Sequence, residues 1–215
     1  MFSLPRKPRN WYPGATYHIT QRGNRKSEIF YDNHDYLKYL GLLEETQQKL
    51  PFTLHTYCLM PNHIHLQLET KETPLSETMR IVNSRYAIYF NKKYELIGHV
   101  FQDRYWAQLI LDDWYMLEAS KYIHLNPVEA NMVENPEIYP WSSCAAYFAP
   151  QKTNPLISTE RILSFFSSPS NKNYIRYLNS EERNSELLAP LLAKNPFIKN
   201  SAYNNNKLQE NHNSI

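Results

Sequence analysis

Cysteine is almost absent from the sequence, which contains only two copies in 215 residues. Cys58 and Cys144 lie far apart, and neither belongs to a CxxC pair. A disulfide framework needs several cysteines at characteristic spacings and a zinc ribbon needs CxxC pairs, so neither class is indicated. We expect both cysteines to be small, buried apolar residues.

Long apolar runs are also absent. The first residues, MFSLPRKPRNWYPG, do not contain the continuous apolar segment of a signal peptide. No other stretch approaches the roughly 18 apolar residues that a membrane-spanning helix requires. The sequence therefore predicts a cytoplasmic protein without a membrane partner.

Acidic residues are missing from residues 1–26, although the formal net charge of the whole chain is only +2. So small a net charge is weak support for a nucleic-acid partner. The distribution is more informative, because it concentrates positive charge near one end of the fold. We expect this segment to contact DNA, with a solvated flexible arm as the alternative. Its cationic residues are Arg6, Lys7, Arg9, Arg22, Arg25 and Lys26.

The spacing of apolar residues predicts alternating strands and helices. The predicted strands are residues 15–21, 52–60, 63–69 and 100–111. The predicted helices are residues 35–50, 74–94 and 114–125, the last of them ended by Asn126-Pro127. This order predicts an α+β fold, a ferredoxin-like antiparallel β-sheet sandwich with helices packed on it.

His63 and His65 are separated by one residue within a predicted strand. Side chains of a strand alternate between two faces, so both imidazoles point to one face and Ile64 points to the other. Two imidazoles on one face can share a metal ion. The pair alone does not decide between a metal site and two histidines that meet by chance.

Tyr122 and Asn126 lie four residues apart in a predicted helix and therefore share one helical face. The asparagine amide oxygen is a reasonable third metal ligand beside two imidazoles, and the tyrosine could then react. A buried core aromatic is the alternative for Tyr122, since the chain contains 17 tyrosines.

Three segments, YCLMPNHIHLQLET, GHVFQDRYWAQLILDD and YIHLNPVEANMV, resemble the REP-associated tyrosine transposases, a group within the HUH transposases of single-strand insertion sequences. The resemblance runs from about Trp11 to Trp141, in the same order and at similar spacing. It implies that Tyr122 is the nucleophile, and that the metal site consists of His63, His65 and Asn126.

The resemblance also implies an activity. Related enzymes cleave and rejoin single-stranded or hairpin-flanked DNA through a covalent 5′-phosphotyrosine, and they use Mg²⁺ or Mn²⁺. Two nitrogen ligands suit Mn²⁺ or Zn²⁺ better than Mg²⁺, so the identity of the metal stays open. Relatives occur as monomers and as homodimers, which leaves the oligomeric state open as well.

Some positions depart from the pattern of the family. Asp103, Trp106 and Glu129 stand where relatives commonly have a glycine, a lysine and a basic residue. These changes motivate an alternative, a domesticated DNA-hairpin-binding protein without strand-transfer activity. Arg85 and Arg104 remain as further candidates for DNA binding. A hydrolase of small phosphoesters is disfavoured, because there is no carboxylate cluster for a second metal.

The composition changes after about residue 150, where Ser, Asn and Pro become frequent. We therefore predict an HUH transposase catalytic domain over residues 1–148 and a small helical appendage over residues 149–199. Residues 200–215 lack an apolar period and are expected to form a disordered tail.

Overall fold

The computed structural model describes residues 10–149, 154–180 and 187–194. From residue 16 to residue 129 the main elements alternate in the predicted order. The elements of this part are β1 (Thr16–Arg22), η1 (Asn24–Lys26), α1 (Asn33–Lys49), β2 (Phe52–Met60), β3 (His63–Thr70), α2 (Leu75–Tyr94), β4 (Trp106–Ile110) and α3 (Asp113–Glu129). They are followed by η2 (Pro136–Ile138), α4 (Cys144–Phe148), α5 (Glu160–Leu163), α6 (Ser170–Leu178) and α7 (Ala189–Lys194).

The strands form one four-stranded sheet in the order β2-β3-β1-β4. Each of the three neighbouring pairs is antiparallel. The order of elements β1-α1-β2-β3-α2-β4, combined with this strand order, is the ferredoxin-like arrangement. The predicted fold class is therefore confirmed.

The two central strands have one apolar and one polar face. Tyr17 and Ile19 of β1 pair with Leu68 and Leu66 of β3, and these four side chains belong to the core that α1 and α2 complete. The alternate residues, among them His65, point to the opposite face. The strand period thus separates the core of the domain from a polar face.

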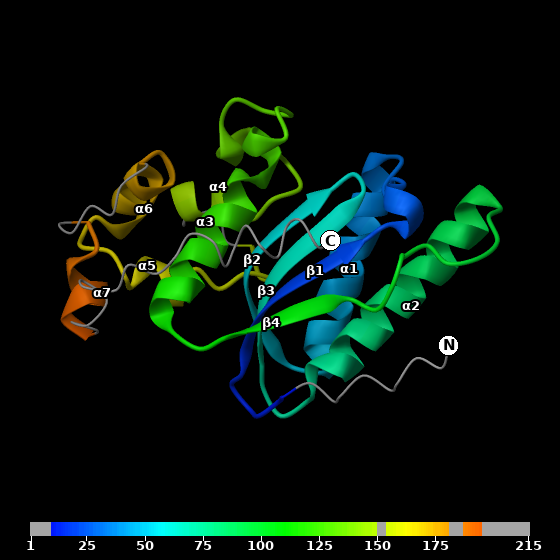
Figure 1. Cartoon of the computed structure of the whole chain (residues 1–215), viewed down its shortest axis with the longest axis horizontal. Helices are drawn as coiled ribbons and strands as arrows, with labels where there is room; N and C mark the ends of the chain where they lie inside the picture. Colours follow the sequence, from blue (N-terminus) through cyan, green and yellow to red (C-terminus); the bar gives the residue numbers. More distant parts are fainter. Residues whose placement is uncertain (1–9, 150–153, 181–186, 195–215) are drawn as a thin grey trace, which may run out of the picture.

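The polar face is covered in part by α3, which crosses it beside β2 and β3 (Figure 1). The Gln67 amide donates a hydrogen bond to the Met116 carbonyl oxygen at 2.7 Å. Farther along α3, Ile123 packs against Cys58 and Met60 of β2. These contacts bring the middle of α3 next to the start of β3.

The strand predicted over residues 100–111 is shorter in the structure, where β4 covers only Trp106–Ile110. Phe101 forms an isolated bridge with Gly23, and the Gln102 amide still bonds the Arg22 carbonyl oxygen at 3.0 Å. The Gln21 side chain then bonds the Asp103 carbonyl oxygen at 3.0 Å in place of a strand partner. Residues 102–104 are exposed as a result, and the ladder is interrupted.

The predicted end of the last helix at Asn126-Pro127 is wrong, since α3 continues to Glu129 with Pro127 inside it. A proline removes its own N–H donor and crowds the preceding turn. The Ala130 amide nevertheless bonds the Asn126 carbonyl oxygen at 3.0 Å. Asn126 therefore stays helical, one turn after Tyr122.

The described C-terminal helices pack on the far side of α3 (Figure 1). Trp114 and Leu117 of α3 share a second apolar cluster with Tyr147, Ile162 and residues of α6 and α7. The predicted appendage thus shares a core with α3. The predicted disordered tail, residues 200–215, lies outside the described residues.

Cys58 and Cys144 are free and buried, as the sequence predicts. Among the helices of the described ranges, none combines the length and the apolar character that crossing a bilayer requires.

A buried carboxylate joins α1 to α2. The Asp35 side chain is fully buried and accepts hydrogen bonds from the Tyr31 amide at 2.7 Å and from the Tyr94 hydroxyl at 2.7 Å. Lys93 lies 2.8 Å from it and also contacts Asp32. Burial alone would raise the pKa of Asp35, but these bonds outweigh it and hold the pKa below its ordinary value.

We predict that Asp35→Asn lowers the free energy of unfolding by about 2–3 kcal/mol at pH 7, because charge-assisted bonds are lost inside the domain. The measurement is urea unfolding followed by circular dichroism. Since the pKa of Asp35 is lowered on folding, its contribution is present above about pH 4 and is lost as the pH falls further. The difference between the wild type and the variant should therefore shrink below about pH 4. Glu44→Gln, at an exposed position of α1, should change stability by less than about 0.5 kcal/mol.

Candidate active site

The two predicted metal-binding histidines lie side by side at the start of β3. Their ring centroids are 4.9 Å apart. Both point to the polar face, as the two-residue period of a strand predicts, while Ile64 is buried in the opposite core.

Each ring nitrogen of His63 faces an amide oxygen, and the neutral ring can donate a hydrogen bond to only one of them. Its Nδ1 lies 2.6 Å from Asn62 Oδ1, and its Nε2 lies 3.2 Å from Asn126 Oδ1 on α3. Burial lowers the pKa of His63 to about 4, with a smaller contribution from Arg22, while the contact with Asn126 acts in the other direction. The imidazole is therefore neutral at physiological pH, which is the form that binds metal ions.

His65 is oriented by residues of the neighbouring strand β1. Its Nδ1 lies 3.3 Å from Thr20 Oγ1 and 3.3 Å from His18 Nε2. The nitrogen that would bind a metal ion is therefore Nε2, and the contacts at Nδ1 fix the orientation of the ring. Sequence reasoning missed His18, although it shares a face with Thr20 in the predicted strand; only the pairing of β1 with β3 places it here.

Tyr122 reaches this histidine cluster from α3. Its ring meets the ring of His65 edge-on at 5.3 Å and the ring of His18 at 5.9 Å. Burial raises the pKa of Tyr122 to about 12, and the negative charge of Glu129 adds to this, while a hydrogen bond with Asn126 and the charge of Arg22 oppose it. The phenol is thus firmly protonated in the protein alone.

The opposite side of α3 is fixed by a buried polar network. His124 Nδ1 lies 2.7 Å from the Tyr174 hydroxyl of α6, and Nε2 lies 2.7 Å from Ser143 Oγ. Burial lowers the pKa of His124 to about 3. His124 is accordingly a neutral residue that holds α3 in position and takes no part in the cluster around Tyr122.

A basic turn borders the site. The Gly23 backbone N–H donates to the Asn62 carbonyl oxygen at 2.8 Å, and the Asn62 side-chain amide donates to the Lys26 carbonyl oxygen at 3.3 Å. Arg25 and Lys26 have φ values of 54° and 62°, which form the tight turn η1. Asn62 thus joins this cationic turn to the ring of His63.

The predicted DNA-binding cations are distributed unevenly. Arg22 of β1 lies opposite His63 of β3 in the sheet, and its positive charge lowers the pKa of both His63 and Tyr122. Arg25 and Lys26 follow in η1, whereas Arg104 lies two residues before the start of β4. Arg6, Lys7 and Arg9 lie outside the described residues.

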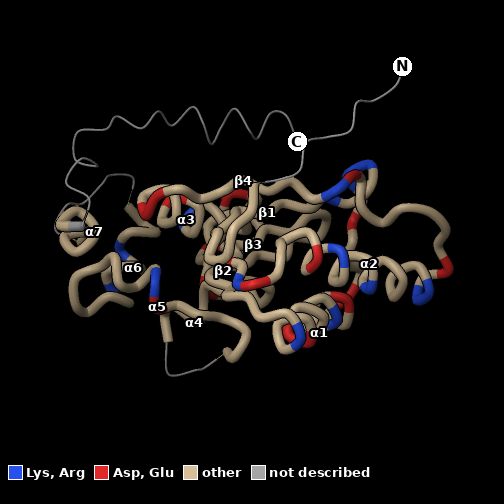
Figure 2. Tube along the Cα trace, turned by 90° about the horizontal axis from the view of Figure 1, so that it is seen from below, with Lys and Arg blue, Asp and Glu red and all other residues tan. Residues whose placement is uncertain are grey.

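Arg85 is not brought to this site. It lies on α2, in the helix layer behind the sheet, and forms an ion pair with Glu45 of α1 at 2.6 Å. Figure 2 shows positive and negative segments interspersed along α1 and α2, so this layer does not present charge of one sign. Arg85 is therefore not part of the proposed site.

The donor atoms around Asn126 fit a divalent cation. Within the described part of the chain, no three His, Cys, Asp or Glu side chains are placed to hold one ion. A metal site here would combine the imidazoles of His63 and His65 with the amide oxygen of Asn126. Such a mixed set leaves coordination positions for phosphate oxygens and water.

Comparisons with known proteins agree with the fold and with the order of the motifs. A family model described as "Transposase IS200 like" matches residues 12–126. A putative REP-associated tyrosine transposase of Haemophilus influenzae is 30% identical over 122 residues, which cover 51% of this chain and 69% of the relative. A solved REP-associated tyrosine transposase, described as bound to a REP hairpin, is similar with a TM-score of 0.59 and 19% identity. That similarity covers 72% of this chain and 92% of the solved chain, and it supports the fold.

The turn at Gly23 offers a test of how closely the site is packed. A Cβ added at Gly23 would lie 2.1 Å from the Ser27 carbonyl oxygen and 2.8 Å from Ile29 Cγ2. We predict that Gly23→Ala destabilises the protein by about 1–3 kcal/mol, measured as a lower urea midpoint. Gly41→Ala is the matched control, because a Cβ there meets nothing within 4 Å. It should stabilise α1 by about 0.5–1 kcal/mol. Equal effects of the two variants would contradict the packing described here.

Proposed function

Because the chain belongs to the family of IS200-like transposases, we propose that it cleaves and rejoins single-stranded or hairpin-flanked DNA, with Tyr122 as the nucleophile. One observation carries this proposal: the Tyr122 ring lies 5.3 Å from that of His65, and Tyr122 is hydrogen-bonded to Asn126, whose amide also meets His63. A tyrosine that served the core alone would not need the hydrogen bond to Asn126 or a place beside the two histidines. All four residues meet within one chain, so a monomer is sufficient for the proposed chemistry.

The electrostatics of the site define what the reaction requires. With a pKa of about 12, deprotonation of Tyr122 at neutral pH costs roughly 7 kcal/mol. Arg22 offsets part of this cost, and Glu129 adds to it. A DNA phosphate brings further negative charge, so additional positive charge is needed at the reacting atoms.

His63, His65 and Asn126 would supply that charge by holding Mg²⁺ or Mn²⁺. A bound divalent cation would polarise the phosphate and stabilise the negative charge that develops on its oxygens. The protein contributes neutral imidazoles and fixed ring orientations. Asn62, Thr20 and His18 contact the Nδ1 atoms and so determine which nitrogens face the ion.

In the proposed step the Tyr122 oxygen forms a bond to phosphorus and the bond from phosphorus to the 3′ oxygen breaks. The phenol proton is lost and the leaving 3′ oxygen gains a proton, so the step is balanced. The products are a 5′-phosphotyrosine and a free 3′ hydroxyl. Since one phosphodiester replaces another, the bond energy is conserved and rejoining needs no ATP.

Single-stranded or hairpin DNA is the partner that the surroundings support best. Arg22, Arg25 and Lys26 place three cations beside the histidine cluster, where they can contact phosphates. The solved relative is described as bound to a REP hairpin.

A second candidate, binding of DNA hairpins without cleavage, is favoured by one residue. Glu129, in the last turn of α3, raises the pKa of Tyr122. Negative charge at this position opposes both formation of the phenolate and the approach of a phosphate. A protein that binds hairpin DNA but forms no covalent product with any divalent metal would fit this second candidate.

Formation of a covalent adduct tests the proposed nucleophile. With Mn²⁺ or Mg²⁺ and a labelled oligonucleotide that carries a hairpin between single-stranded arms, the wild type should form an adduct visible in denaturing gels. We predict that Tyr122→Phe abolishes the adduct and leaves DNA binding within about threefold, because only one hydroxyl is removed. Tyr31→Phe, a half-exposed tyrosine of the helix layer, should form the adduct normally. An adduct that persists in Tyr122→Phe would overturn the assignment.

Mn²⁺ titration, followed by the paramagnetic resonance signal of the free ion, tests the proposed ligands. All variants carry Tyr122→Phe and are bound to hairpin DNA, so no reaction intervenes. His63→Ala and His65→Ala should each weaken Mn²⁺ binding by at least about tenfold, and Asn126→Asp should retain it through a carboxylate oxygen. His34→Ala is the control, because the His34 side chain is 83% exposed. Equal affinity in all variants would exclude the proposed site.

A further inference from the structure

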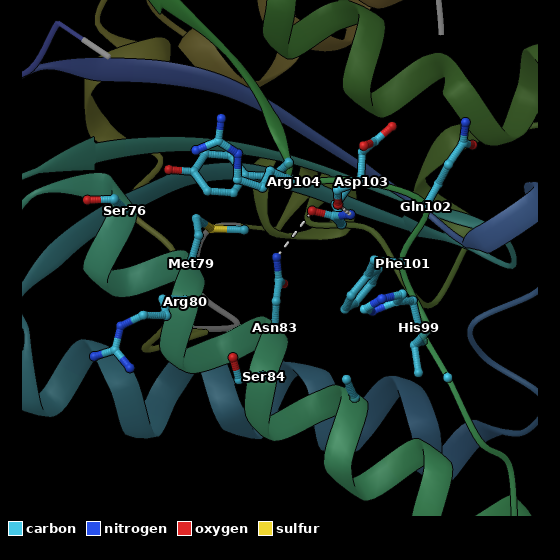
Figure 3. Close-up of a pocket in the computed structure, with 15 residues that line it drawn as sticks. Ser76, Met79, Arg80, Asn83, Ser84, His99, Phe101, Gln102, Asp103 and Arg104 are labelled. Atoms are coloured by element: carbon cyan, nitrogen blue, oxygen red, sulfur yellow. Dashed lines mark hydrogen bonds between the residues drawn. The ribbon is translucent and has the colours of Figure 1, made fainter. Parts of the chain in front are cut away.

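A pocket of about 660 Å³ lies between the first half of α2 and residues 98–105 (Figure 3). Its volume falls within the range of about 300–1,000 Å³ that small-molecule sites occupy. Gln21 of β1 lies in its lining, on the face of the sheet opposite to Thr20 and His65. The pocket is therefore separate from the cluster around Tyr122, although a single strand divides the two.

The inner end of the pocket consists of oriented amides. The Tyr39 hydroxyl donates to Asn83 Oδ1 at 3.1 Å, and Asn83 Nδ2 donates to Gln21 Oε1 at 3.2 Å. Gln21 Nε2 in turn donates to the Asp103 carbonyl oxygen at 3.0 Å. This chain fixes which end of each amide donates. Because an amide nitrogen carries two hydrogens, Asn83 and Gln21 can each donate once more.

The walls combine apolar and aromatic side chains with polar ones, and the rim carries the cations of Arg80 and Arg104 together with the carboxylate of Asp103. Figure 3 shows the Asn83 amide projecting from α2 between Met79 on one side and Phe101 on the other. Arg80 and Arg104 belong to the lining and are exposed at its outer part. Arg80 pairs with Glu77 at 3.1 Å, but both side chains are at least half exposed, so the pair is weak and can open.

The wall formed by residues 98–105 is tied to the rest of the protein. The Asn91 side chain bonds the Gly98 carbonyl oxygen at 2.9 Å, and Gly98 has a φ of 106°. The Asn24 amide bonds the Val100 carbonyl oxygen at 2.8 Å. The pocket wall and the basic turn η1 are thus held together, and the pocket is formed before a ligand arrives.

The pocket and the active site lie on opposite faces of the sheet, both at the C-terminal end of β1. Thr20 contacts His65, Gln21 lines the pocket, and Arg22 again faces His63. β4 is an edge strand, and its first residue, Trp106, lies 6.0 Å from the ring of His18. A DNA strand that leaves the active site across this edge would pass the mouth of the pocket.

We infer that the pocket binds one unpaired nucleobase of the DNA strand on which Tyr122 acts. This inference rests on the proposed function. Amides that can still donate recognise the edge of a base, and aromatic and thioether side chains contact its face. Arg80 and Arg104 lie where the flanking phosphates would remain, outside the pocket. A phosphate bound inside would instead meet amides and apolar side chains.

Replacement of single bases tests the inference. The probe is a fluorescent oligonucleotide with a hairpin between single-stranded arms of mixed sequence, in which each arm nucleotide in turn is made abasic. The hairpin fixes the register, so loss of the base that enters the pocket should weaken binding by at least about fivefold at one position. Abasic substitutions at all other arm positions should have smaller effects.

Blocking the pocket supplies the matched comparison. Ser84→Trp places an indole at the exposed mouth of the pocket, and Ile88→Trp places one a turn farther along α2, outside the lining. Ser84→Trp should bind intact and abasic DNA with equal affinity, because its pocket is already blocked. Ile88→Trp should still bind DNA that is abasic at the sensitive position more weakly than intact DNA. Thermal unfolding of both variants checks that the fold is intact.

The outcomes separate this inference from the proposed strand transfer. A loss of DNA binding at one abasic position, without any covalent adduct, would support the pocket and contradict the proposed strand transfer. Adduct formation with no position-specific loss, or with a loss that survives in Ser84→Trp, would overturn the pocket alone. A protein that binds no single-stranded or hairpin DNA would overturn both.

Discussion

The packing of α3 onto the polar face of the sheet is the contact on which the site depends. The hydrogen bond from Gln67 to the Met116 carbonyl oxygen and the burial of Ile123 against β2 fix the position and the rotation of this helix. Each residue of a helix is turned by roughly 100° from its neighbour, so a shift of one position would turn Tyr122 away from His65. Because β3 supplies both Gln67 and His65, the same strand that carries the histidines also determines where the tyrosine lies.

Burial has two electrical consequences in this site, and both are in accord with the proposed chemistry. It keeps the ring of His63 neutral, as a metal ligand must be, and it keeps the Tyr122 phenol protonated. In the proposed mechanism, a phenol that is hard to ionise in the protein alone would not react before DNA and a cation are bound together. The positive charge of Arg22 lowers the pKa of both His63 and Tyr122, so it favours the neutral imidazole and the ionised phenol. Glu129 acts against ionisation of the phenol.

The sequence predicts those parts of the site that depend on local periodicity. The strand period places His63 and His65 on one face, and the helix period places Tyr122 one turn before Asn126. His18 was missed because its neighbours depend on the register between β1 and β3, which one sequence does not reveal. The interruption of the ladder at residues 102–104 was missed for a related reason, since the Gln21 side chain of β1 bonds the Asp103 carbonyl oxygen there. Arg85 carries the positive charge that a DNA contact needs, but tertiary packing gives it Glu45 as an ion-pair partner.

The far side of α3 explains why the residues after the matched segment matter to the site. The family model ends at residue 126, yet α3 is held by groups beyond that point. Lys121 donates to the Tyr177 carbonyl oxygen at 2.9 Å, the Tyr177 hydroxyl donates to Glu118, and His124 meets Tyr174. Without α6 these polar groups of α3 would lose their partners, which is costly for a buried side chain. If Tyr122 becomes covalently joined to DNA, as proposed, α3 also has to resist displacement by the attached strand. The anchoring contacts of His124 lie on the side of α3 opposite to Tyr122, so they would provide that resistance without blocking the proposed site.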